Sequence, residues 1–143
     1  MDKTISRKAL VYCVDRNRLL VFRHVDRSWE EVGVQIPAGT IRPDEAPEQA
    51  ALRELCEETG RDTFAVQEFI GTTQYDMSPY RREIQERHFF RAHPTAPLPE
   101  RWFSREEHDG QRAPTRFECF WIPLAAGHVL QAGQSAMLWR LAP

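Results

Sequence analysis

The sequence predicts an α+β fold in which helices pack against a mixed central sheet. Strand-like segments dominate, one segment has a strong helical pattern, and another has a weaker one. The 143 residues match the size of one domain and suffice to enclose a hydrophobic core. Because no repeat, low-complexity tract or linker interrupts them, we expect a single domain over residues 1–143.

The strands are predicted from apolar or alternating runs bounded by turn residues. The first two surround a turn at Asp15–Arg18. Pro37 and Gly39 break the third, and Pro123 stops the last. In chain order the segments are KALVYCVDRNRLLVFRHV (two strands), VGVQIPAG, FAVQEFIGTTQY, EIQERHFFRAH and RFECFWIPL. The segment SREEHDGQRAP is polar and is predicted to be a loop.

The strong helical segment follows the third strand. Pro47 suits the first helical position, Glu48 and Gln49 suit the first turn, and Gly60 suits the C-terminal cap. Near the C-terminal end, the segment GQSAMLWRL predicts a second, short helix.

Composition and charge narrow the function classes. Hydrophobic residues make up 41% and charged residues 28%, as in ordinary globular proteins, and the net charge of −2 argues against a generalised nucleic-acid or anionic-membrane binder. No segment approaches the roughly 18 apolar residues that span a membrane, and no signal peptide is visible, so we expect a cytoplasmic location. Cys13, Cys56 and Cys119 lack metal-binding spacing and are expected to be buried thiols in a reducing compartment.

The helix is predicted to gather acidic side chains on one face. At roughly 100° per residue, one side carries Ala50, Glu54, Glu57, Glu58 and Arg61. The other side, predicted to face the core, carries Ala51, Leu52, Leu55, Cys56 and Thr59. Like charges at this spacing repel by about 0.2–0.5 kcal/mol per pair on an exposed helix. Either ion pairs with basic neighbours or a bound cation must offset that repulsion.

The spacing outside the helix favours the cation. Gly39 is followed by five residues and Glu45, then by seven residues and RELCEETG. This pattern resembles the Nudix hydrolase signature, G-x5-E-x7-R-E-U-x-E-E-x-G-U, where U is a bulky aliphatic residue. The matching residues are Gly39, Glu45, Arg53, Glu54, Leu55, Glu57, Glu58 and Gly60. Average residue frequencies make such a match by accident on the order of one in ten million. Arg61 occupies the last aliphatic position and is expected to alter packing beyond the helix.

The resemblance implies both a fold and a chemistry. The fold would be an α/β/α sandwich with a mixed central sheet, one catalytic helix and a C-terminal helix. The activity would be a Mg²⁺- or Mn²⁺-dependent hydrolysis, by water attack, of the diphosphate bond in a nucleoside diphosphate derivative. A diphosphate repels an incoming nucleophile, and magnesium, which prefers hard oxygen ligands such as carboxylates and carbonyls, neutralises that charge.

Carried over residue by residue, the resemblance assigns roles within the motif. Glu57 and Glu58 would be the principal metal ligands, and the Gly39 carbonyl would be another. Glu54 would be either a ligand or the base that deprotonates the attacking water. Arg53 would orient a glutamate through a charge-assisted hydrogen bond, and Glu45 would stabilise the loop.

A further carboxylate outside the motif often completes the site in this family. The candidates are Glu86, Glu106, Glu107 and Glu118. We favour Glu107 as a catalytic residue, because a mobile loop could bring it to the attacking water only when substrate is bound. Glu118 has a plainer alternative, which is pairing with a cross-strand arginine. His108 has no partner histidine at ligand spacing, so no zinc site is expected.

Aromatic and basic residues outside the motif have two interpretations. On a strand, Arg87, Phe89 and Arg91 alternate to one face, where they could contact phosphates and a base. The simpler interpretation, which we prefer, is an amphipathic strand with arginine on its solvent face. The tryptophans are expected in the core or at its rim, with one stacking on a base as the alternative; they are Trp29, Trp102, Trp121 and Trp139.

Two function hypotheses remain at this point. The first is the metal-dependent hydrolase acting on a small-molecule nucleotide. The second is a non-catalytic Nudix-fold module that binds a nucleotide and regulates a partner. An incomplete glutamate set or an attached DNA-binding domain would favour the second, and the sequence shows neither. The sequence does not identify the substrate, and it leaves a homodimer open.

Overall fold

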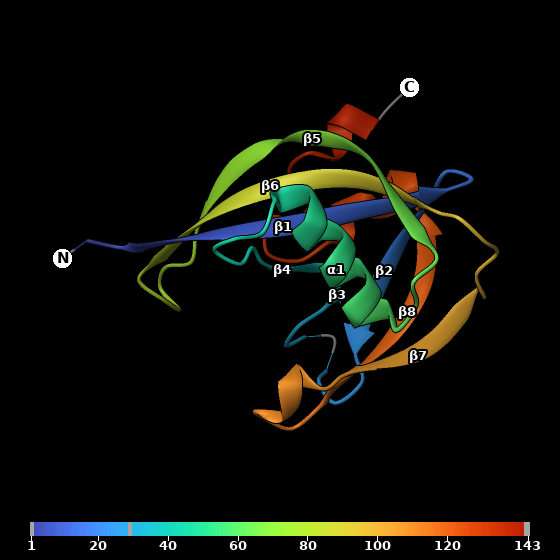
Figure 1. The fold of residues 1–143 in the computed structure, drawn as a ribbon, viewed down its shortest axis with the longest axis horizontal. Helices are drawn as coiled ribbons and strands as arrows, with labels where there is room; N and C mark the ends of the chain where they lie inside the picture. The colour runs from blue at the N-terminus through green and yellow to red at the C-terminus, as the bar shows by residue number, and fades with distance from the viewer. Residues whose placement is uncertain (1, 29, 142–143) are drawn as a thin grey trace.

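The computed structural model describes residues 2–28 and 30–141 and shows a mixed eight-stranded sheet (Figure 1). The strand order is β5-β6-β1-β2-β8-β7, with β3 paired to β2 and β4 paired to β1. The elements are β1 (Thr4–Asp15), β2 (Arg18–His24), β3 (Val34–Gln35), β4 (Ala38–Thr40), α1 (Pro47–Thr59), β5 (Phe64–Asp76), β6 (Glu83–Pro94), β7 (Arg101–Glu106), β8 (Thr115–Pro123) and three 3-10 helices, η1 (His108–Gly110), η2 (Leu124–Val129) and η3 (Leu138–Leu141). This architecture confirms the predicted α+β class.

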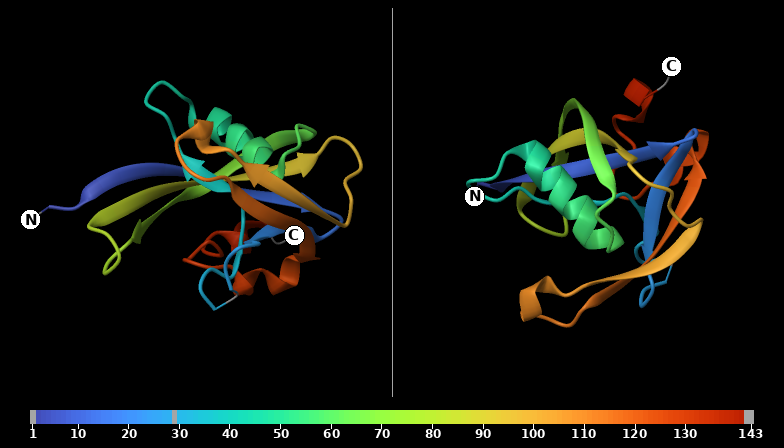
Figure 2. Two further views of the ribbon diagram at one scale, coloured as in Figure 1. Left: turned by 90° about the horizontal axis from the view of Figure 1, so that it is seen from below. Right: turned by 45° about the vertical axis from the view of Figure 1, so that its right-hand side comes forward.

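Strand β1 lies inside the sheet and is covered on both sides. It pairs in parallel with β6 and antiparallel with β2 and β4. Alternate residues of its apolar run enter two cores: Val11 packs with Leu55 of α1, whereas Leu10 packs with Met137 of the C-terminal segment. Helix α1 and the C-terminal turns therefore cover opposite faces of the sheet, as the left view of Figure 2 shows. A strand buried on both faces reads as a continuous apolar run, as this one does.

Helix α1 begins and ends where the sequence predicts. Pro47 is its first residue, and the Gln49 side chain accepts a hydrogen bond from the Ala46 N–H at 3.0 Å. Gly60 caps the C-terminal end in the left-handed conformation, with φ of 68°, which glycine adopts without a steric penalty. The positions of both ends are thus explained by local chemistry.

The predicted core face of α1 is partly wrong. Leu52 is 37% exposed and Cys56 is only partly buried, whereas Ala50, Glu54 and Glu58 are buried. The reason is that α1 does not lie flat on one layer. It contacts β1, β4 and β5 and also β7 of the hairpin, so residues next to the acidic side chains are buried as well.

Two further predictions about elements are wrong. The segment predicted as a loop from Ser104 onward begins inside β7, where Ser104 pairs with Phe117 and Glu106 with Thr115. The predicted C-terminal helix is instead a series of turns ending in η3. The Tyr12 hydroxyl donates to the Gln134 carbonyl and accepts from the Met137 N–H, so the sheet engages backbone groups that an α-helix would pair internally.

Several single-residue expectations can also be compared with the structure. Trp102 is buried and donates to the Thr59 carbonyl at 2.8 Å, whereas Trp139 is exposed. Trp29 lies outside the described residues. Arg87 contradicts the prediction of a solvent-facing arginine, because it is 5% exposed beneath the C-terminal segment and its guanidinium lies 4.1 Å from the Tyr75 ring centroid.

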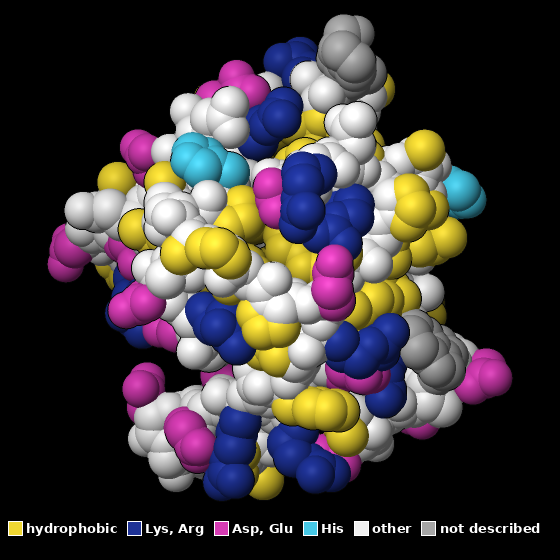
Figure 3. Space-filling model, turned by 90° about the vertical axis from the view of Figure 1, so that its right-hand side faces the viewer, with side chains coloured by type: hydrophobic (Ala, Val, Ile, Leu, Met, Phe, Trp, Pro, Cys, Tyr) yellow, Lys and Arg dark blue, Asp and Glu magenta, His cyan; other side chains and the backbone are white. Residues whose placement is uncertain are grey.

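The remaining gross features agree with the sequence. Cys13 and Cys119 are buried free thiols, as expected, whereas the free thiol of Cys56 is only partly buried. Arg61 stacks its guanidinium 5.0 Å from the Trp102 ring centroid, which is a packing role beyond the helix cap. Within the described part of the chain, the helices are too short or too polar to cross a membrane. On the face in Figure 3, basic, acidic and hydrophobic side chains are interspersed.

Candidate active site

A pocket of about 1070 Å³ lies between α1, β4 and the β7–β8 hairpin. Its walls carry four motif residues that the sequence singles out for the metal: Gly39, Glu54, Glu57 and Glu58. Arg53 also lines it, as do Glu106 and Glu107 from the hairpin. The fold therefore brings the predicted motif and part of the downstream acidic segment to one cavity.

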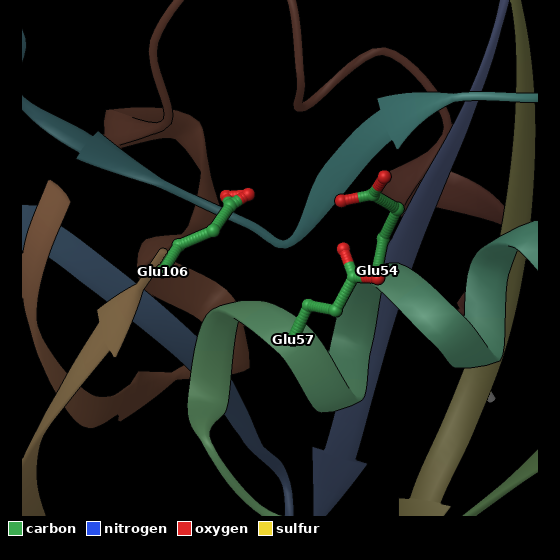
Figure 4. Close-up of side chains that lie close together, drawn as sticks. All are labelled: Glu54, Glu57 and Glu106. Atoms are coloured by element: carbon green, nitrogen blue, oxygen red, sulfur yellow. The ribbon is translucent and has the colours of Figure 1, made fainter. Parts of the chain in front are cut away.

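Three carboxylates from two elements converge in this pocket. Glu54 and Glu57 stand one turn apart on α1, and Glu106 ends β7 on the opposite wall. Each offers an oxygen that lies within 4.8 Å of the others, and Figure 4 shows the three side chains pointing towards a common space. Hard oxygen donors grouped in this way suit Mg²⁺ or Mn²⁺ better than softer metals.

Gly39 leaves room for Glu54 beside β4. A Cβ atom at position 39 would lie 2.0 Å from the Glu54 carboxyl carbon, so the Glu54 side chain could keep its present position only next to a glycine. Pairing of Gly39 with Ala9 fixes this strand against β1, so the glycine backbone itself forms the wall behind Glu54. Gly39 therefore lies directly against the Glu54 carboxyl group.

Arg53 orders the acidic face through a set of charge-assisted hydrogen bonds. Its guanidinium donates to both carboxylate oxygens of Glu45, at 2.7 and 2.8 Å. It also donates to Glu54 at 2.7 Å and to the Thr40 carbonyl at 2.9 Å. Because Glu45 also accepts the Arg42 N–H at 3.1 Å, this network fixes the loop before α1.

Burial makes the negative charge of two acids costly in the absence of a cation. Burial raises the pKa of Glu54 to about 7, although the Arg53 guanidinium works in the opposite direction. Burial, reinforced by the charge of Glu54, also raises the pKa of Glu58 well above its ordinary value. The Glu58 carboxylate accepts the Ala38 N–H at 2.7 Å, which ties α1 to β4. A divalent cation at this site would favour the ionised forms of both acids.

The other candidate carboxylates lie in different surroundings. Glu107 lines the pocket, but its side chain is 64% exposed and pairs with Arg105 at 2.8 Å. Glu86 bonds His88 at 2.8 Å on β6. Glu118 accepts from Arg23 at 2.6 Å and from Arg101 at 2.7 Å, so its plainer alternative, a cross-strand ion pair, is confirmed. Neither Glu86 nor Glu118 is among the residues that line the pocket.

The far end of the pocket holds polar and aromatic residues that the sequence does not single out. His24 lies 3.3 Å from the Gln35 side-chain oxygen and packs edge-on against Phe117, with ring centroids 5.1 Å apart. Burial lowers the pKa of His24. These residues come from β2, β3 and β8, and only the strand pairing brings them together, so no local sequence signal could have identified them.

The fold and the site together describe an α+β domain with acids that converge from one helix and one hairpin. The family model described as NUDIX domain matches residues 5–136. The chain therefore belongs to the Nudix family. The expected fold class and the expected enzyme class, a Nudix-type pyrophosphohydrolase acting on acid anhydrides, are both confirmed.

Solved structures support the fold over nearly the whole chain. A MutT NUDIX hydrolase from Burkholderia pseudomallei superposes with a TM-score of 0.69 at 15% identity, covering 98% of this chain and 100% of that one. The MutT protein from Methanosarcina mazei Go1 gives 0.68 at 16% identity, with 98% and 94% covered. The E. coli dihydroneopterin triphosphate pyrophosphohydrolase gives 0.65 at 16% identity, with 96% and 94% covered. No curated protein gives a significant match.

Proposed function

We propose that this protein is a Mg²⁺- or Mn²⁺-dependent hydrolase that cleaves the diphosphate bond of a nucleoside diphosphate derivative by water attack. The observation that carries the proposal is the convergence of Glu54, Glu57 and Glu106 within 4.8 Å of one another in the pocket. Ionised carboxylates this close together repel one another unless a cation binds between them. Their oxygen atoms are the ligands that Mg²⁺ and Mn²⁺ prefer.

The chain's own residues divide the work. Glu54, Glu57 and Glu58 would hold the metal together with the Gly39 carbonyl, as the motif implies. When bound, the metal would neutralise phosphate charge and lower the pKa of water. Arg53 positions Glu54, which would be either a metal ligand or the base that deprotonates the attacking water.

The downstream acid is more simply Glu106 than Glu107. Glu106 already points at the α1 acids from a strand, and strands hold geometry better than loops do. Glu107, our choice from sequence, would have to leave its ion pair with Arg105 to reach the same space. A catalytic role for Glu107 stays a prediction. The variants Glu106→Gln and Glu107→Gln together decide between the two acids.

The substrate class is argued from chemistry and family. Two proteins of the same fold have names that refer to phosphorylated substrates, a dihydroneopterin triphosphate pyrophosphohydrolase and a UDP-X diphosphatase. We extend to this chain only the broad substrate class, a small-molecule nucleotide. We also propose that the protein acts in the cytoplasm, where free thiols such as Cys13 and Cys119 persist.

The experiment is a panel of nucleoside di- and triphosphate derivatives incubated with the protein, with and without magnesium. Release of phosphate, diphosphate or nucleoside monophosphate only in the presence of the metal is expected. Lack of turnover for every compound would favour the regulatory, non-catalytic module instead.

A further inference from the structure

Arg53 has no hydrogen-bond donor left for a substrate. Its Nε and one Nη2 hydrogen are used by Glu45, and the other Nη2 hydrogen by the Thr40 carbonyl. Its Nη1 donates to Glu54 at 2.7 Å and to Glu57 at 3.5 Å. A guanidinium only donates, so binding a phosphate would break these bonds. A side-chain cation that contacts a bound diphosphate, in addition to the metal, must therefore be another residue of the pocket.

Arg112 is the arginine in the pocket that is both free to donate and held in place. In the described chain, its one hydrogen bond is donated by Nη2 to His108 Nδ1 at 3.2 Å, which leaves most of its N–H groups available. Arg105 also has N–H groups left over, but its charge is paired with the Glu107 carboxylate at 2.8 Å, whereas the described partner of Arg112 is an imidazole nitrogen. For Arg42, the described hydrogen bonds are made by its backbone N–H and carbonyl, so none of them orients its side chain.

His108 is itself fixed from two sides. Because Nδ1 accepts from Arg112, the neutral imidazole carries its proton on Nε2 and donates to Thr115 Oγ1, at 2.6 Å. The backbone is left-handed at His108 and Asp109, with φ of 53° and 55°, which is uncommon for residues other than glycine. Such conformations persist where the surroundings hold them, and they concentrate at functional sites.

This support places Arg112 beside the acidic cluster. The Glu106 carboxylate lies 3.6 Å from the same His108 nitrogen that accepts from Arg112. Glu106 points towards Glu54 and Glu57 in Figure 4. An anionic group bound next to Glu106 is therefore within reach of the Arg112 guanidinium, on the wall opposite α1.

We propose that Arg112 is a substrate-binding residue that contacts a phosphate of the diphosphate group, and that His108 is the positioning residue that presents it. The inference rests on the proposed function for its substrate class. It adds a residue outside the motif and assigns the β7–β8 connection a role in binding. The fork of N–H donors suits phosphate oxygens, whereas a lysine would offer a single point charge.

The test is the affinity of the full chain for methylenediphosphonate, a diphosphate analogue that resists hydrolysis, measured by titration calorimetry with magnesium present. Arg112→Ala should weaken binding roughly ten- to hundredfold, the range for a lost charge-assisted contact. The affinity of Arg112→Lys for the analogue should lie between those of the wild type and Arg112→Ala. The control is Arg116→Ala, which removes an exposed arginine paired with Asp26 outside the pocket and should change the Kd by less than about twofold.

His108 is tested by a double-mutant cycle. His108→Ala should weaken binding, but it should have almost no further effect in the Arg112→Ala background, because its contribution passes through Arg112. His108→Asn should restore much of the affinity, since its side-chain oxygen replaces Nδ1 as acceptor and asparagine tolerates the left-handed backbone. A purely structural role for His108 would instead give additive losses that asparagine does not rescue.

The outcomes separate this inference from the proposed function. Wild-type affinity in Arg112→Ala, additive effects in the cycle, or no binding of the analogue by the wild-type protein would each overturn the inference. Hydrolysis by the wild-type protein together with an unchanged KM in Arg112→Ala would leave the proposed function standing and remove Arg112 from it. If Arg112→Ala loses analogue binding but the wild type turns over no compound, Arg112 would stand as a diphosphate-binding residue and the proposed hydrolase function would fall.

Discussion

The contact between Gly39 and Glu54 shows how a single backbone position shapes the site. Gly39→Ala would drive a Cβ into the Glu54 carboxyl group, and the flexible side chain would have to leave the cluster. We expect metal affinity and activity to fall at least about tenfold, the lower end for loss of a ligand or its support. Titration with Mn²⁺ followed by electron paramagnetic resonance measures the first effect. Glu54→Ala provides the control, since adding Gly39→Ala to it should cost little more; a large further loss would contradict the steric explanation.

Glu57 and Glu58 should differ in their effect on stability although both are proposed to hold the metal. Glu57 is exposed, so Glu57→Gln should leave the melting temperature of the metal-free protein nearly unchanged. Glu58 is buried with a raised pKa, and Gln can still accept the Ala38 N–H, so Glu58→Gln should raise the melting temperature at pH 8 by about 2–6 °C. Thermal melts in EDTA make the comparison. A lower melting temperature for Glu58→Gln than for the wild type would show that groups in the protein compensate the charge of Glu58.

At the scale of elements, helix α1 could be predicted from local chemistry, whereas the hairpin could not. Pro47 and Gly60 mark the helix ends with residues suited to those positions. In β7, the polar Ser104 and Glu106 alternate with exposed Phe103 and Arg105, so the strand lacks an apolar face and exists through its pairing with β8. The acid that completes the cluster therefore could not be chosen from sequence, because its position depends on that pairing.

The hairpin leads to a prediction that separates two neighbouring acids. Glu106→Gln should reduce the rate by roughly 10²–10⁴, as for loss of a catalytic acid–base or ligand group, and should alter the acidic limb of the pH–rate profile. Glu107→Gln removes an exposed ion pair and should keep both rate and profile close to wild type. The reverse pattern would restore Glu107 as the residue that meets the water.

At the scale of the whole molecule, the charge of the buried site acid Glu54 affects the stability of the fold. The pKa of Glu54 rises from about 4.5 to about 7 on folding, so between these values the folded protein binds a proton that the unfolded chain does not. The stability of the metal-free protein should therefore be greatest below about pH 4.5 for this group and decrease as pH rises through 7. Magnesium should stabilise more at pH 8 than at pH 5.5, by about 3 °C or more in melting temperature. Equal shifts at both pH values would mean that the metal binds elsewhere.

The layered architecture could be predicted from the strand pattern, but the way its last layer forms could not. The apolar run of β1 predicted a strand, and the structure shows that this strand is covered on both faces. The C-terminal segment reads as helical, yet Tyr12 captures its backbone groups from across the sheet. Arg87 is buried by the same segment, which is why its burial could not be read from the alternation of β6. In both cases a contact between residues far apart in the chain overrides the local pattern.

The central claim is that the acids of α1 and the hairpin hold a cation for diphosphate hydrolysis. The most direct measurement is the turnover of the best compound from the nucleotide panel, as a function of magnesium concentration, for the wild type, Glu57→Gln and Glu106→Gln. We predict turnover in the wild type that requires magnesium, and a loss of at least about 10²-fold in both variants. Turnover that persists in EDTA, or that both variants retain, would contradict the claim.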